Sequence, residues 1–175
     1  MNSESARDRM LLRRLRWWTA LFIVGLVLSG ATAIPLETEL NWLTPLLGDH
    51  PDTIPARWLT RVQAALHETN VRYPFIAYGS DWLAFGHFVI ALAFLWAWRD
   101  PVGHRWLFDF GLLACALVIP YALFIGALRG IPFWWRLIDC SFGLAGSLPL
   151  YLCRRYAAQL ARAAGNSTSP PGMPG

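Results

Sequence analysis

The chain contains no lysine and has little charge of either sign. Its 175 residues include 15 basic and 11 acidic side chains, and every basic one is an arginine. The net charge of +4 is concentrated at the chain ends and in short turns, as it is in membrane topology signals. We therefore expect no nucleic-acid partner.

Cysteines and catalytic motifs are also scarce. The three cysteines include no Cys-x-x-Cys pair, which argues against a disulfide framework or a thiol-exchange carrier. No P-loop, nucleophile elbow, His-Glu-x-x-His or glycine-rich dinucleotide motif is present. Only His87 falls within a predicted span, so bis-histidine haem would need a dimer that pairs two copies of it. The cofactor is thus not identified, and residues 49–52 are interpreted as a polar turn rather than a weak metal site.

Long apolar blocks, by contrast, are abundant, and 55% of the residues are hydrophobic. Because blocks of about 18 apolar residues are long enough to cross a bilayer, we predict an all-α polytopic membrane protein with a four-transmembrane-helix bundle. The predicted segments are a basic N-terminus at 1–16, a membrane domain at 17–155 with spans at 17–34, 81–98, 106–128 and 132–153, and a tail at 156–175 that is disordered at its end. The first span also resembles a signal peptide, whose cleavage would leave three spans.

Residues 35–80 form the large loop of this prediction. Within it, residues 55–69 are predicted to form a short amphipathic helix, because Pro55 suits a first helical position and Asp52 or Thr53 can cap it. Its apolar side chains recur every four residues at Trp58, Val62 and Leu66. Such a helix lies on a membrane surface or covers the end of a bundle.

Arginine is distributed unevenly between the two predicted sides of the membrane. The N-terminus, the 99–105 turn and the C-terminal end carry ten arginines, whereas the 35–80 loop carries three, together with five acids. By the positive-inside rule both termini are cytoplasmic, and the loop is extracytoplasmic, in a bacterial inner membrane. Tryptophans agree with this topology, at the inner interface in positions 17, 18, 96, 98 and 106 and at the outer one in positions 82, 134 and 135.

The stretch 129–143, RGIPFWWRLIDCSFG, places two charges inside the fourth predicted span. Arg136 and Asp139 are three residues apart and share a helix face, and charges within a span usually have a partner or a function. Small or polar residues form a stripe on the second span (Ser80, Ala84, His87 and Ala91) and a face on the fourth (Cys140, Gly143 and Ser147). Since small residues let helices approach closely, we predict that these faces pack together and bring His87 near Asp139.

We predict a ligand-binding cluster in the outer half of the bundle: Arg136, Asp139, His87, Asp81, Arg129 and Glu39, with Glu37 beside it. Each main member also has a plainer interpretation. Arg136 and Asp139 can be a structural ion pair, and Asp81 can be a helix cap. Arg129 suits the C-terminal end of a helix dipole, and a lone histidine in a span is often a hydrogen-bonded packing residue.

Two functions are compatible with this cluster. The first is a non-enzymatic membrane protein that binds a lipid, a small ligand or a membrane-protein partner, alone or as a homo-oligomer. The alternative is a membrane enzyme in which His87 and Asp139 act as acid and base while Arg136 and Arg129 orient an anionic substrate.

Three segments carry a resemblance to other proteins: SGATAIPLETEL (29–40), YPFIAYGSDWLAFGH (73–87) and RGIPFWWRLIDCSFG (129–143). They resemble an uncharacterised family of small four-span bacterial inner-membrane proteins, over most of residues 25–155. The resemblance implies a helical membrane domain and brings no known activity with it.

Overall fold

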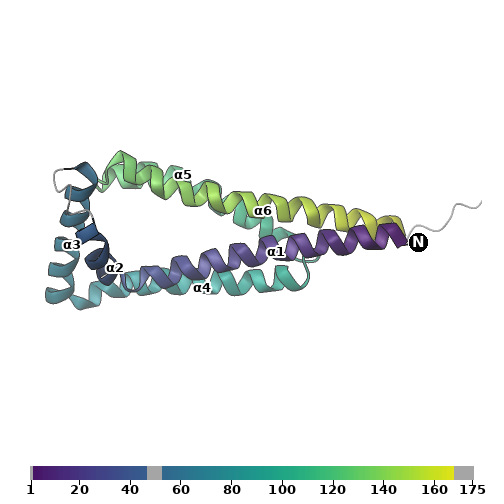
Figure 1. Ribbon diagram of the computed structural model, residues 1–175, viewed down its shortest axis with the longest axis horizontal. Coiled ribbons are helices and arrows are strands. Elements are labelled where there is room, and N and C mark those ends of the chain that lie inside the picture. The colour runs from purple at the N-terminus through teal and green to yellow at the C-terminus, as the bar shows by residue number, and fades with distance from the viewer. Residues whose placement is uncertain (1, 47–52, 168–175) are drawn as a thin grey trace, which may run out of the picture. The chain divides into compact units, whose positions relative to one another are not determined.

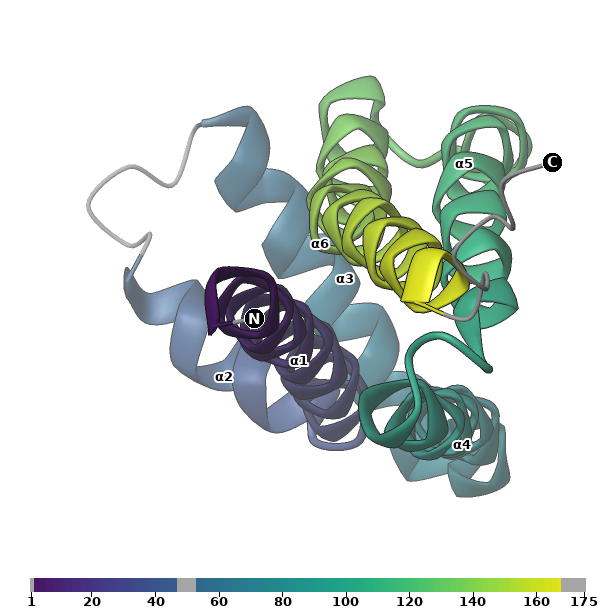
Figure 2. The same cartoon turned by 90° about the vertical axis from the view of Figure 1, so that its right-hand side faces the viewer.

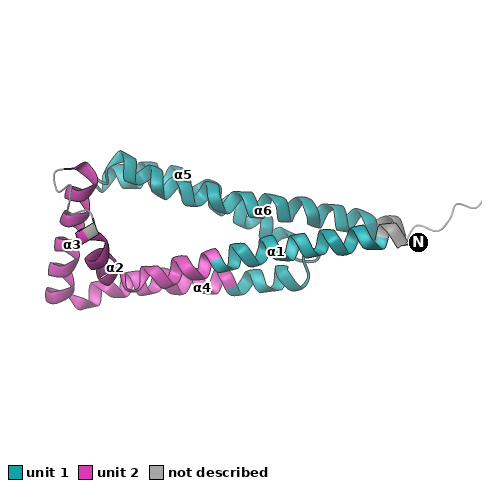
Figure 3. Ribbon diagram, viewed as in Figure 1, with its two compact units in different colours: residues 1–24, 92–175 teal, residues 25–91 magenta. Residues whose placement is uncertain are grey.

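The computed structural model describes residues 2–46 and 53–167, which form helices joined by short turns (Figure 1). The elements are α1 (Asn2–Ala33), α2 (Leu36–Leu46), α3 (Ile54–Arg72), the 3-10 helix η1 (Pro74–Ala77), α4 (Tyr78–Arg99), α5 (Arg105–Leu128) and α6 (Phe133–Ser167). No strand occurs within the two described ranges, so the all-helical prediction is confirmed. The chain divides into two compact units, residues 1–24 with 92–175 and residues 25–91, and each is described by itself (Figure 3).

Three of the described helical segments are long and apolar enough to cross a membrane: Ser5–Ala33, Pro74–Arg99 and Arg105–Leu128. They coincide with the first three predicted spans. The fourth predicted span lies in α6, which is not one of the three. Arg136 and Asp139 are the reason, because they lower the hydropathy of the otherwise apolar first half of α6.

Two helices extend beyond the predicted spans. Helix α1 begins at Asn2, so the basic N-terminal segment is continuous with the first span. Helix α6 continues to Ser167, so its arginines at 154 and 155 lie inside a helix and do not follow one. Neither proline nor glycine occurs between residues 150 and 164, and the alanines there favour a helix. The tail beyond residue 167 and the polar turn at 49–52 lie outside the described residues.

The start of α4 differs from the interpretation of Asp81 as its cap. Pro74 opens the 3-10 turn η1, which leads directly into α4 at Tyr78. Asp81 therefore lies in the first turn of the helix, where a negative charge suits the positive end of the helix dipole. The cap prediction was wrong because the sequence signal for the 3-10 turn was not recognised.

Four helical segments share one apolar core in the unit formed by residues 1–24 and 92–175. The ring of Phe94 in α4 lies 4.7 Å from that of Phe22 in α1 and 6.3 Å from that of Phe108 in α5, centroid to centroid. Helix α6 joins through Cys153, whose Sγ lies 3.4 Å from the buried hydroxyl of Thr19 in α1. Through these contacts the segments of α1, α4, α5 and α6 in this unit pack against one another.

Helices α5 and α6 lie side by side through small residues (Figures 1 and 2). A Cβ atom added to Gly143 would lie 2.6 Å from the carbonyl oxygen of Cys115, so the two backbones approach closely there. Cys140 is buried on the same face, with its Sγ 3.8 Å from the Ile119 carbonyl oxygen. The small face of the fourth predicted span therefore packs on α5.

The small stripe of α4 packs against α1. In the unit of residues 25–91, Ala84 and Ala91 are buried, as a packed stripe requires. A Cβ atom added to Gly30 of α1 would lie 3.0 Å from the Ala84 carbonyl oxygen and 3.1 Å from the Cβ of His87. The predicted pairing of the two small faces with each other joins the two units and stays a prediction. A small face allows close approach, but it does not specify which helix approaches.

Large apolar side chains outside these contacts are exposed along the helices. Leu128 and Phe124 of α5 are 82% and 72% exposed, and Phe142 and Leu148 of α6 are 66% and 57% exposed. An apolar surface of this extent requires lipid or another protein to cover it. Helix α6 shares this property with the three candidate spans.

Candidate functional site

Arg136 connects α6 to α5. One of its terminal guanidinium nitrogens donates a hydrogen bond of 2.9 Å to the Leu123 carbonyl oxygen. Its aliphatic stem lies over Gly126, where an added Cβ would be 2.7 Å from two of the stem carbons. The guanidinium carbon lies 5.2 Å from the centroid of the Phe133 ring, which is cation–π geometry. The missing side chain of Gly126 thus creates the space in which Arg136 packs.

Asp139 does not pair with Arg136, although a buried ion pair was one interpretation of the sequence. Neither Arg136 nor Asp139 forms an ion pair with any of the described residues. The Arg136 side chain extends to the α5 backbone instead, because the space over Gly126 accommodates its aliphatic stem. Its Nε is buried and has no hydrogen-bond partner among the described residues.

Asp139 and Arg129 line the same groove, at the end of the α5–α6 pair that carries the connecting turn. The groove has a volume of about 250 Å³, and its other lining residues are Val118, Tyr121, Ala122, Ile125, Gly126 and Ile131. Neither charged side chain forms a hydrogen bond or an ion pair within the described part of the chain. The groove therefore presents one cation and one anion on a mainly apolar surface. We call it the α5–α6 groove.

The remaining predicted site residues lie in the other unit. Nδ1 of the half-buried His87 donates to the Leu83 carbonyl oxygen at 2.8 Å, which is the hydrogen-bonded packing role. The exposed Asp81 lines a shallow groove with Tyr78, Trp82 and Phe85. Glu39 is half-buried in α2. The predicted approach of His87 to Asp139 joins two units and stays a prediction.

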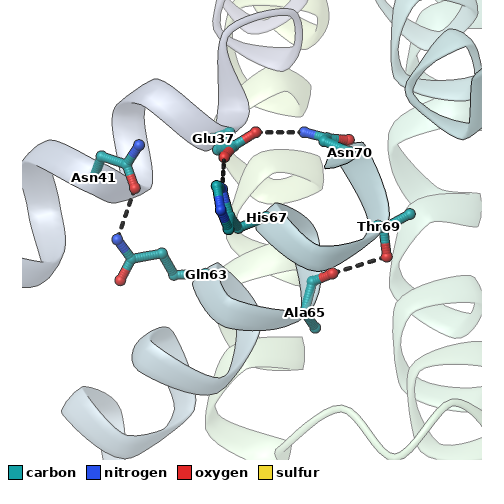
Figure 4. A network of polar contacts seen from close by, with 7 residues as sticks. All are labelled: Glu37, Asn41, Gln63, Ala65, His67, Thr69 and Asn70. Carbon is teal, nitrogen blue, oxygen red and sulfur yellow. Dashed lines mark hydrogen bonds and ion pairs between the residues drawn. The ribbon is translucent and has the colours of Figure 1, made fainter. Parts of the chain in front are cut away.

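A polar cluster that the sequence did not reveal connects α2 to α3 (Figure 4). The Glu37 carboxylate accepts hydrogen bonds of 2.6 Å from Nδ1 of His67 and from the Asn70 amide. The Gln63 amide donates to the Asn41 side-chain oxygen at 2.7 Å. Five polar side chains thus dock the two helices, and Glu37 has a structural role in this contact.

These hydrogen bonds favour the ionised form of Glu37. The hydrogen bond from Asn70 and then the one from His67 hold the pKa of the carboxyl below its usual value of 4.5. The interaction therefore contributes to docking above the pKa of the undocked carboxyl, and it is lost as the pH falls through the lowered pKa.

Helix α3 is present where a helix was predicted, but the face that it packs differs from the predicted apolar face. Thr53 caps it, since its side-chain oxygen accepts from the Ala56 amide at 3.4 Å, and a proline occupies the first turn. The buried residues are Ala56 and Leu59. The predicted apolar face at residues 58, 62 and 66 is half-buried beside them. The shift occurs because the docking uses amide side chains that a search for apolar residues overlooks.

A second charged groove, also missed from the sequence, lies in the first unit. It has a volume of about 460 Å³ and is lined by Arg9, Leu12, Arg13, Arg16, Trp17, Ala20 and Trp98. The arginines of α1 were interpreted as a topology signal alone. Their spacing of four and three residues, which places them on one helix face, was the signal available. No group of three or more metal-ligating side chains occurs among the described residues.

Comparisons with protein-family models, with curated proteins and with solved structures find no match to this chain. The resemblance noted from three segments of the sequence therefore remains an expectation. What fold and composition define is a class: an all-helical protein with three helices able to cross a membrane and an extensive apolar surface.

Proposed function

We propose that the protein is an integral inner-membrane protein whose four long helices all cross the bilayer. Helix α6 supports this through its exposed apolar side chains, among them Phe142 and Leu148. Two charged side chains, Arg136 and Asp139, lie where a span of this kind carries its functional groups. The arginine distribution orients the protein with both termini in the cytoplasm and the α2–α3 segment outside.

Fusions to a reporter enzyme that is active only outside the cytoplasm test this topology. Fusions after residues 60 and 130 should be active, and fusions after residues 103 and 164 should be inactive. The fusion after residue 164 decides the position of α6. Activity there would mean that α6 does not return the chain to the cytoplasm, and the four-span topology would be wrong.

We further propose that the α5–α6 groove binds a lipid or a small amphiphile whose headgroup carries both a negative and a positive group. The observation that supports this is that Arg129 and Asp139 line one groove with neither charge paired. A guanidinium binds phosphate or carboxylate well, and a carboxylate binds an ammonium group. The apolar side chains at residues 118, 125 and 131 would contact the alkyl part of such a ligand.

Binding is favoured over catalysis by the chemistry of the groove. Its lining contains no histidine and no cysteine, and Tyr121 is the one other titratable side chain beside Asp139 and Arg129 among the described lining residues. The nitrogen Nδ1 of His87 is already engaged with the Leu83 carbonyl oxygen. The enzyme alternative with His87 and Asp139 gains no support from this arrangement.

Native mass spectrometry on gently purified protein tests the binding function. The wild type should retain a zwitterionic lipid or amphiphile, and Asp139→Asn and Arg129→Gln should each reduce its retention by roughly tenfold, the loss of one hydrogen bond to a charged group. Glu68→Gln and Arg72→Gln are matched controls, because they remove the same charges from an exposed ion pair on α3. Equal retention in the groove variants and the controls would exclude the groove as the binding site.

A further inference from the structure

The basic groove on α1 has the composition of a binding site for a phosphate group at a membrane interface. Arg9, Arg13 and Arg16 recur at four- and three-residue spacing, so that all three face the same groove. Arg9 and Arg13 are exposed, and neither forms an ion pair with another described side chain. Asp8, on the same helix, is not part of the lining. The groove therefore has an uncompensated positive charge.

Arg16 is oriented by an aromatic ring, and one of its hydrogen-bond donors has no partner among the described residues. Its guanidinium carbon lies 5.4 Å from the centroid of the Trp98 ring at the end of α4, an arrangement that orients the planar group. Its Nε is buried and has no hydrogen-bond partner among the described residues. A buried donor without a partner is costly, and an anionic acceptor would relieve this cost with a charge-assisted hydrogen bond.

The rest of the lining is apolar or aromatic. Trp17 is 72% exposed, and Leu12 and Ala20 lie beside it in the groove. Tryptophan is typical of the headgroup level of a bilayer, where its ring contacts the glycerol and upper acyl region. A dissolved phosphate compound would use only the arginines, whereas a phospholipid would use both parts of the groove.

We propose that this groove binds the phosphate diester of an anionic phospholipid, with Arg9, Arg13 and Arg16 around the phosphate and Trp17 and Trp98 against the glycerol end. The proposal does not depend on the function assigned to the α5–α6 groove, because the two grooves share no residue. It concerns a net negative lipid, whereas the α5–α6 groove selects a headgroup with both charges.

The test uses the full-length protein in nanodiscs that contain phosphatidylcholine with a minor share of phosphatidylglycerol. The protein is then released into detergent, and native mass spectrometry counts the retained lipids. The wild type should retain phosphatidylglycerol in preference to phosphatidylcholine. The double variant Arg9→Gln/Arg13→Gln should lower this retention by roughly tenfold or more, since each arginine would contribute a hydrogen bond to a charged group. Both side chains are exposed, so the variant should fold, and circular dichroism would check its helix content.

The matched control is Arg7→Gln/Arg14→Gln, which removes the same charge from the same helix at positions outside the groove lining. It should retain phosphatidylglycerol nearly as well as the wild type. An equal loss in both double variants would show a general surface-charge effect and overturn the site. Displacement of the lipid by millimolar inorganic phosphate would assign the groove to soluble phosphate compounds and overturn the lipid assignment.

Discussion

Replacing Gly143 by alanine tests the close packing of α5 on α6. The added Cβ atom would lie 2.6 Å from the carbonyl oxygen of Cys115, which belongs to a helix backbone and cannot rotate away. A carbon and a carbonyl oxygen normally approach to about 3.3 Å, so the helices must separate by roughly 0.7 Å at this point. Overpacking of this kind costs about 1–3 kcal/mol.

The measured change will be smaller than this cost, because alanine is a better helix former than glycine by about 1 kcal/mol. Gly25→Ala provides the matched control. Gly25 also lies inside a helix, and a Cβ atom added to it would have nothing within 4 Å. The difference between the two variants therefore isolates the cost of the clash.

Unfolding by urea in detergent micelles, followed by circular dichroism, gives the two free energies of unfolding. Gly25→Ala should be as stable as the wild type or more stable, and Gly143→Ala should be less stable than Gly25→Ala by about 1–3 kcal/mol. Equal stability of the two variants would refute the close approach of α5 and α6 at Gly143.

Two further predictions concern polar contacts. Because hydrogen bonds hold the pKa of Glu37 below 4.5, the protection of residues 54–72 against hydrogen exchange, relative to the intrinsic exchange rate at each pH, should be high above that pH and fall as the pH falls through the lowered pKa. Glu37→Gln should abolish this pH dependence, and a transition that persists in the variant would contradict the assignment. Because Arg136 bonds to the α5 backbone and not to Asp139, the stability effects of Arg136→Met and Asp139→Asn should add within about 0.5 kcal/mol in a double-mutant cycle in detergent. A coupling energy well above that value would show that Arg136 and Asp139 interact and would contradict this prediction.

The sequence predicted the helices well because their signals are local. The apolar blocks, the turn around residues 99–105 and the threonine–proline start of α3 each depend on neighbours in the chain, and the structure agrees with them. The continuation of α6 to Ser167 was missed because arginines after a span were interpreted as its end, although they are good helix formers.

The contacts between helices were less accessible from the sequence. The stripe at Ala84 and the face at Gly143 were each recognised as packed, and the sequence did not indicate their contacts with α1 and α5. The side-chain direction of Arg136 depends on the space left by Gly126 in the neighbouring helix α5, not on the nearest acid in sequence. Asp139 and Arg129 could be named as candidates from their positions in the sequence, whereas the groove that both line could only be found in three dimensions.

The most direct test of the α5–α6 groove as a ligand site is photolabelling in the membrane. A phosphatidylethanolamine analogue with a photoreactive group near its headgroup is added to the protein in nanodiscs, and the labelled residues are identified by peptide mass spectrometry. Labelling should concentrate on residues 118–131 and around Asp139, and it should fall in Asp139→Asn. Labelling spread evenly over the exposed apolar surfaces of α4 and α5, and unchanged in that variant, would contradict the proposed site.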